Sequence, residues 1–182
     1  LGEYNTAIAD LTTAIRLDPD YAIAYISRGI TYGLLGEYNT AIADYTTAIR
    51  LDPDYALAYN NRGATYMRMG NYNTAIADCT TAIRLDPDYA EAYYVRGAAY
   101  ANLGEYNIAI ADFTTAIRLD PFGANTYYDR GRAYGKLGEY NTAIADYTTA
   151  IRLDPDYALA YNNRGIAYSD LGEYNTAIAD YT

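Results

Sequence analysis

The sequence predicts an all-α solenoid of antiparallel helix pairs, and this prediction rests on three observations. The segment Leu35–Gly63 returns without a change at Leu137–Gly165, and looser copies set a period of 34 residues with no insertion. A fixed period of this size is typical of solenoid proteins. Within each copy, apolar residues recur at helical spacing, and glycine or proline stands where each helix should end.

One copy shows why each repeat unit should contain two helices. Tyr59 and Tyr66 mark one helical face, and Gly70 ends that helix because glycine readily adopts the left-handed conformation. A second apolar stripe begins at Tyr72 and runs until Pro87, which lacks the amide that a continuing helix needs. We therefore expect helix pairs near residues 22–35 and 38–51, 56–69 and 72–85, and onward at the same period.

The residues of this unit resemble the tetratricopeptide repeat. The pattern of aromatic, small and proline positions comprises Tyr59, Gly63, Tyr66, Gly70, Tyr72, Ala75, Cys79, Ala82 and Pro87. The resemblance covers the whole chain, as a partial unit 1–21, full units 22–55, 56–89, 90–123 and 124–157, and a partial unit 158–182. It implies a single array over residues 1–182 with a right-handed superhelical course. The arginine before each repeated glycine replaces the family's usual leucine and resembles a bacterial branch.

Composition argues against several classes of function. The formal net charge is -10 and no block of bases occurs, which argues against a nucleic-acid partner. No apolar run is long enough to span a membrane. The sequence contains no histidine, so the commonest general base is missing, and we expect neither an enzyme nor a cofactor. Nothing assigns a compartment; the cytoplasm is the default.

Three recurrent features have structural interpretations. Asp52 and Asp54 flank a proline, where acids favour the positive end of the next helix; a calcium site would need a longer ligand loop. Cys79 lies in the apolar stripe and is expected to be a buried core thiol. Thr12, Thr13 and their copies are expected on a solvated convex face.

The repeated arginines predict ion pairs within each helix hairpin. Arg62 and Asp78 lie at nearly equal distances from the turn at Gly70, so an antiparallel hairpin brings them together. The predicted pairs are Arg28 with Asp44, Arg62 with Asp78, Arg96 with Asp112, and Arg130 with Asp146. A structural ion pair is favoured over an anion-binding site.

The resemblance also implies a concave groove, lined by the first helix of each pair, that holds a peptide. Its polar and charged candidates are Asn60, Asn61, Arg68, Glu91, Tyr94, Asn125, Tyr128, Asp129, Arg132, Asn162 and Asn163. The first full unit instead places Ile23, Ile26 and Ile30 on this face, which predicts an apolar end. The unit 124–157 is the most polar, through sequence drift or through a binding role.

Two hypotheses about function follow from the resemblance. The first is a non-enzymatic scaffold that binds a peptide or protein segment in its groove. A carboxylate clamp is disfavoured because Arg68, Arg132 and Lys136 are spread over distant units, whereas the asparagines partly resemble a ladder that grips peptide backbone. The second hypothesis is an array that stacks head to tail, because the helices nearest its ends present uncovered apolar faces.

Overall fold

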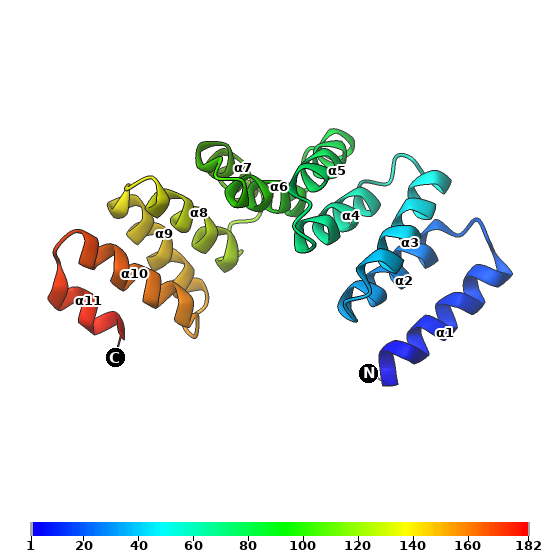
Figure 1. Cartoon of the computed structure of the whole chain (residues 1–182), viewed down its shortest axis with the longest axis horizontal. Helices are drawn as coiled ribbons and strands as arrows, with labels where there is room; N and C mark the ends of the chain where they lie inside the picture. The colour runs from blue at the N-terminus through cyan, green and yellow to red at the C-terminus, as the bar shows by residue number, and fades with distance from the viewer. Residues whose placement is uncertain (1, 182) are drawn as a thin grey trace. The chain divides into compact units, whose positions relative to one another are not determined.

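The chain folds into α-helices alone over residues 2–181, the part that this computed structural model describes (Figure 1). The helices are α1 (Gly2–Leu17), α2 (Ala22–Leu34), α3 (Tyr38–Leu51), α4 (Ala56–Arg68), α5 (Tyr72–Leu85), α6 (Ala90–Asn102), α7 (Tyr106–Leu119), α8 (Ala124–Lys136), α9 (Tyr140–Leu153), α10 (Ala158–Asp170) and α11 (Tyr174–Tyr181). The predicted all-α architecture of helix pairs is confirmed. The even-numbered helices are the first members of their pairs, and the odd-numbered helices that follow are the second.

A glycine in the left-handed region ends each first helix. At the end of α2, Gly36 has a φ of 80°, and the N–H of Glu37 donates to the carbonyl of Tyr32 at 2.9 Å. Gly36 itself donates to the carbonyl of Gly33 at 3.2 Å. These bonds satisfy carbonyls that the last helical turn leaves unpaired, and they turn the chain into the second helix. The same conformation recurs at Gly70, Gly104, Gly138 and Gly172.

The acid–proline segments end the second helices. At the end of α3, the N–H of Asp52 makes the last helical bond, to Ala48 at 2.8 Å, and the following residue is a proline. The Asp52 carboxylate then accepts a hydrogen bond from the N–H of Asp54 at 3.2 Å, a local turn that aspartate favours. Equivalent bonds occur at Asp18, Asp86, Asp120 and Asp154. The first acid of each pair is therefore a turn-forming residue.

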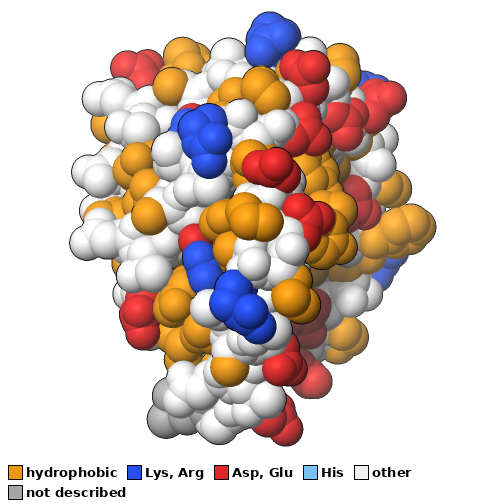
Figure 2. All heavy atoms as spheres, turned by 90° about the vertical axis from the view of Figure 1, so that its right-hand side faces the viewer, with side chains coloured by type: hydrophobic (Ala, Val, Ile, Leu, Met, Phe, Trp, Pro, Cys, Tyr) orange, Lys and Arg blue, Asp and Glu red, His pale blue; other side chains and the backbone are white. Residues whose placement is uncertain are grey.

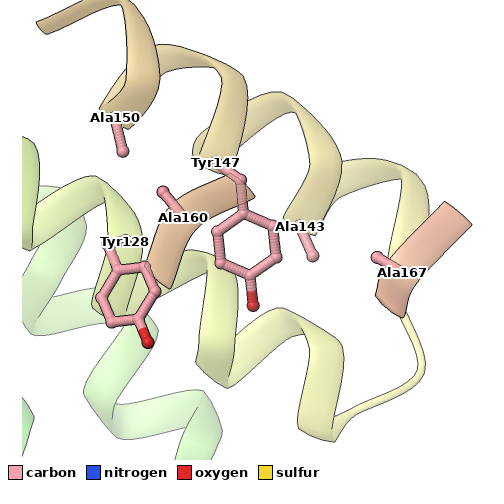
Figure 3. Packing of buried hydrophobic residues seen from close by; sticks show 6 residues of the cluster. All are labelled: Tyr128, Ala143, Tyr147, Ala150, Ala160 and Ala167. Atoms are coloured by element: carbon pink, nitrogen blue, oxygen red, sulfur yellow. The ribbon is translucent and has the colours of Figure 1, made fainter. Parts of the chain in front are cut away.

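The core consists mainly of alanines packed around a few larger side chains. One cluster contains Tyr128 of α8, Ala143, Tyr147 and Ala150 of α9, and Ala160 and Ala167 of α10 (Figure 3). Alanines let the helices approach closely, and the aromatic ring fills the remaining volume. A Cβ atom at Gly131 of α8 would lie 2.9 Å from Tyr147 Cε1, so this approach requires glycine.

The chain divides into two compact units, an N-terminal half (Leu1–Val95) and a C-terminal half (Arg96–Thr182), with the boundary inside α6. Within each half, helices that follow one another in the sequence lie side by side (Figure 1). The single array over 1–182, its unit boundaries and its right-handed course stay predictions.

Candidate functional site

Each first helix carries an arginine that binds the second helix of its own pair. Arg28 Nε and Nη2 donate to the two carboxylate oxygens of Asp44, both at 2.8 Å. This two-pronged geometry is the strong form of an arginine–carboxylate contact, and the bond to Asp44 raises the pKa of Arg28. The structure brings together Arg62 and Asp78, Arg96 and Asp112, and Arg130 and Asp146 in the same way, and adds Arg164 and Asp180.

The same arginine also reaches the preceding helix pair. Arg28 Nη1 donates to Thr12 Oγ1 of α1 at 3.1 Å, and the guanidinium lies 5.7 Å from the ring centroid of Tyr25. Equivalent bonds join Arg62 to Thr46, Arg130 to Thr114, and Arg164 to Thr148. Thr12 is exposed, as the sequence led us to expect, but its role between repeats was missed. These arginines brace the fold and are not free anion ligands.

In the N-terminal half, the predicted groove asparagines lie deeper than expected. Asn60 is 2% exposed, and its Nδ2 donates to Tyr89 Oη at 3.2 Å. Asn60 Oδ1 and Asn61 Nδ2 are buried without a hydrogen-bond partner among the described residues. Arg68 is exposed at the end of α4; on α6, Glu91 is exposed and Tyr94 is partly buried. Asn60 is therefore an interior residue of this half.

The expected apolar end of the groove also lies in this half. Ile23 and Ile30 of α2 are 48% and 40% exposed, and Leu34 is 59% exposed. Ile26 is 2% exposed and belongs to the core with Tyr45 of α3. The exposed side of α2 therefore presents three large apolar side chains.

In the C-terminal half, Tyr128 is held in place by its neighbours. Its ring centroid lies 5.9 Å from that of Tyr147 and 4.9 Å from that of Tyr157. Asn163 Nδ2 donates to Tyr128 Oη at 3.0 Å, and Asn162 Nδ2 donates to Asn163 Oδ1 at 3.3 Å. Both polar atoms of the Asn163 side chain are therefore paired inside the protein.

Charged side chains flank this cluster on α8. Arg132 Nη1 donates to Asp129 Oδ1 at 2.9 Å, while its guanidinium lies 5.7 Å from the centroid of the Tyr128 ring. The Arg132 side chain is 55% exposed, so it stays open to solvent on its other side. Lys136 is exposed one turn later, and Asn125 is exposed at the start of the helix.

A pocket of about 500 Å³ opens beside these side chains, between α8 and α10. It is lined by Arg132, Gly135 and Lys136 of α8, Tyr140 and Tyr147 of α9, and Asn163, Ile166, Ala167 and Asp170 of α10. Of the predicted groove residues it brings together Arg132 and Asn163. Sequence reasoning missed Tyr147 as a lining residue because it belongs to the packing stripe of a second helix. The signal that the sequence offered was Gly135, a glycine inside a first helix, which leaves room for a neighbouring side chain. In the structure, a Cβ atom at Gly135 would lie 3.7 Å from Tyr147 Oη.

Tyr147 is a neutral hydroxyl donor at the base of this pocket. The residue is 4% exposed, and burial is the main cause that raises its pKa. A phenol whose pKa lies above its ordinary value near 10 stays protonated at neutral pH. The pocket therefore combines two cations, one acid and a buried phenol.

Other kinds of site find no support in the part of the chain that the structure describes. No group of three or more His, Cys, Asp or Glu side chains is placed to hold a metal ion, and no helix is long and apolar enough to cross a membrane. Cys79 is fully buried, as predicted. On the face shown in Figure 2, Lys and Arg side chains occur in separate places among acidic and apolar ones.

Comparison of the sequence with protein-family models finds one kind of repeat along the chain. One model described as TPR repeat matches residues 1–36, 34–70 and 131–172. Two models described as tetratricopeptide repeat match residues 56–89 and 90–122, and residues 113–145. Comparison with curated proteins gives no match.

Solved structures with this fold include close matches in length. The MamA protein is 31% identical, covers 88% of this chain and 87% of its own, and superposes with a TM-score of 0.78. YrrB, described as a TPR protein with an unusual peptide-binding site, is 24% identical over 93% and 88% of the two chains, with a TM-score of 0.75. The APC/C hetero-tetramer Cut9–Hcn1 gives 22% identity over 98% of this chain and 36% of that chain, with a TM-score of 0.85. The last two likenesses support the fold alone.

Proposed function

Because the chain belongs to the tetratricopeptide repeat family, we propose that it is a non-enzymatic scaffold that binds an extended peptide or protein segment along its first helices. The observation that supports this proposal is the pocket between α8 and α10, where polar groups from three helices converge beside exposed apolar surface. A concave site with a few convergent polar groups is the usual form of a binding site.

The proposed binding surface combines groove residues expected from the sequence with residues that line the pocket in the structure. In the C-terminal half it comprises Arg132, Asn162 and Asn163 together with Lys136 and Asp170. In the N-terminal half it comprises the exposed apolar side of α2 and Arg68, whereas Asn60 acts through packing.

Peptide binding is tested by screening extended peptides against the isotope-labelled chain and following backbone amide resonances by NMR. We expect a binding peptide to shift resonances of α8 and α10 in the C-terminal half, or of α2 and α4 in the N-terminal half. A screen in which no peptide causes a shift, or in which all shifts lie on second helices, would contradict the proposal.

Head-to-tail stacking is the second candidate function. It is favoured by α11, where Tyr174, Ile178 and Tyr181 are 66%, 59% and 51% exposed. Neighbouring exposed apolar side chains of this kind usually mark an interaction site. Light scattering over a concentration series separates the candidates: a mass that rises with concentration supports stacking, and a constant monomer mass excludes it.

A further inference from the structure

The pocket between α8 and α10 contains the hydroxyl of Tyr147, whose surroundings differ from those of the equivalent tyrosine in the N-terminal half. There, Tyr45 is 3% exposed; burial raises the pKa of its hydroxyl, and the nearby Thr65 side chain lowers it. Tyr147 is the equivalent of Tyr45 in the identical segment Leu137–Gly165, and Ala167 stands where Thr65 stands. A methyl group cannot accept a hydrogen bond, and among the described residues Tyr147 Oη has no side-chain partner. Figure 3 shows the Tyr147 hydroxyl well separated from the Ala167 methyl group.

This hydroxyl can be reached by a ligand. Tyr147 and Ala167 both line the pocket, and Gly135 leaves the space above the ring open. Because this hydroxyl faces the pocket and is not used in packing contacts with another polar side chain, it is available to donate a hydrogen bond to an incoming group. In the N-terminal half, the Thr65 side chain lies beside the equivalent hydroxyl.

The residues on the α8 side of the pocket also differ from their equivalents in the N-terminal half. Arg132 and Lys136 stand where the N-terminal half has Ile30 and Leu34, so two cations replace two apolar side chains. Lys136 makes no ion pair among the described residues. Arg132 makes one hydrogen-bonded ion pair, from its Nη1 to Asp129 Oδ1. The α8 side of the pocket therefore offers donors and positive charge beside the Tyr147 hydroxyl. Asp170 lies on the opposite wall, on α10.

We propose that this pocket is a subsite for the carboxylate of an aspartate or glutamate side chain in an extended peptide. Tyr147 Oη and Lys136 Nζ donate to the carboxylate, and Arg132 adds positive charge. Charge-assisted bonds of this kind are stronger than neutral ones. The inference rests on the proposed function of peptide binding and names the chemistry of one position along the peptide. Asp170 opposes this anion, so the carboxylate points toward α8.

Fluorescence anisotropy with three labelled peptides tests the subsite. The first alternates alanine and glutamate and is blocked at both ends, the second has glutamine in place of glutamate, and the third is the glutamine peptide with a free C-terminal carboxylate. We expect the glutamate peptide to bind most tightly. Tyr147→Phe and Lys136→Ala should each weaken that peptide by about tenfold, the usual worth of one charge-assisted bond. Asp170→Asn should strengthen it.

Two further variants separate binding from folding. Ala167→Thr places a hydroxyl beside Tyr147, as Thr65 lies beside Tyr45, so it should compete with the glutamate peptide and weaken its binding without lowering the melting temperature. Tyr45→Phe is the matched control: it removes the equivalent hydroxyl outside the pocket, so it should leave the peptide affinity unchanged.

Each outcome has a defined meaning. Equal affinity for the glutamate and glutamine peptides overturns the subsite but leaves the proposed function in place. Tightest binding of the free C-terminus, or weaker glutamate binding in Asp170→Asn, also overturns it, because the site then recognises a chain end or a cation. Failure of every peptide in the NMR screen removes the proposed function and the subsite together.

Discussion

The identical segments Leu35–Gly63 and Leu137–Gly165 place the same asparagine side chain, Asn61 or Asn163, in two different surroundings. Asn163 Nδ2 donates to Tyr128 Oη at 3.0 Å, whereas the equivalent atom of Asn61 is buried without a partner. The cause lies one repeat earlier, where Ile26 stands at the position of Tyr128 and brings no hydroxyl. We therefore predict that replacing the two asparagines by valine, the residue found at this position on α6, changes stability in opposite directions.

The magnitudes follow from hydrogen-bond energetics. Asn61→Val removes a buried unpaired donor, which costs about 1 to 3 kcal/mol where it occurs, so the variant should be more stable by up to that amount. Asn163→Val removes a formed bond and leaves the hydroxyl of Tyr128 unpaired, so the variant should be less stable by roughly 1 to 2 kcal/mol. Valine and asparagine differ little in helix propensity, so backbone effects cancel.

Urea unfolding followed by circular dichroism measures both variants. Repeat arrays can unfold in parts, so the midpoints are read for each variant against the unmodified chain under the same conditions. The double variant should lie near the sum, because the two sites belong to different halves. A loss of stability in Asn61→Val, or shifts of the same sign in both variants, would refute the reasoning.

Three other predictions concern the core and are checked by the same unfolding assay, with alkaline titration for the last. Arg62→Leu or Asp78→Ala alone should cost about 3 to 5 kcal/mol, since these side chains are 18% and 10% exposed, and the double variant should cost less than the sum of the two. Gly131→Ala should cost about 1 to 3 kcal/mol because its Cβ would lie 2.9 Å from a tyrosine ring, whereas Gly135→Ala, with only a 3.7 Å contact, should stabilise α8 by up to about 1 kcal/mol. Burial raises the pKa of Tyr45 to about 12, above the value near 10 that it has in the unfolded chain. The contribution of the neutral phenol to the free energy of unfolding is therefore complete below pH 10 and falls by roughly 2 to 3 kcal/mol as the pH rises toward 12. Tyr45→Phe should abolish this dependence on pH.

The helices could be predicted from the sequence because their signals are local. Gly36 adopts the left-handed conformation that its position after an apolar stripe indicated, and α3 ends one residue before Asp52, at the acid–proline segment. The pairing of Arg62 with Asp78 needed only the assumption of an antiparallel hairpin. In these cases the partners lie within one repeat unit, so spacing along the chain is enough to locate them.

The binding surface was harder to predict because its partners come from different repeat units. Asn60 was expected on an open face, but it is buried and bonded to Tyr89, which lies 29 positions later. The bond between Asn163 and Tyr128 spans 35 positions. A helical wheel assigns a side chain to a face but does not say which neighbour covers it. The arginine–threonine bonds between adjacent helix pairs were missed for the same reason.

The comparison of the two segments also indicates where recognition should be encoded. The arginine, the aspartate and the central tyrosine are the same in both copies, and they pack or brace the hairpin. Around these constant residues the two copies differ at the following pairs: Ile26 and Tyr128, Ile30 and Arg132, Leu34 and Lys136, Ala64 and Ile166, Thr65 and Ala167, and Arg68 and Asp170. Of the residues in the C-terminal copy, all but Tyr128 line the pocket, and Tyr128 bonds to a lining residue. If the pocket were only a packing defect, exchanging these residues between the halves would alter stability alone. We expect the exchange to move the preference for an acidic peptide from the C-terminal half to the N-terminal half, as followed by the amide resonances of α4 and α10.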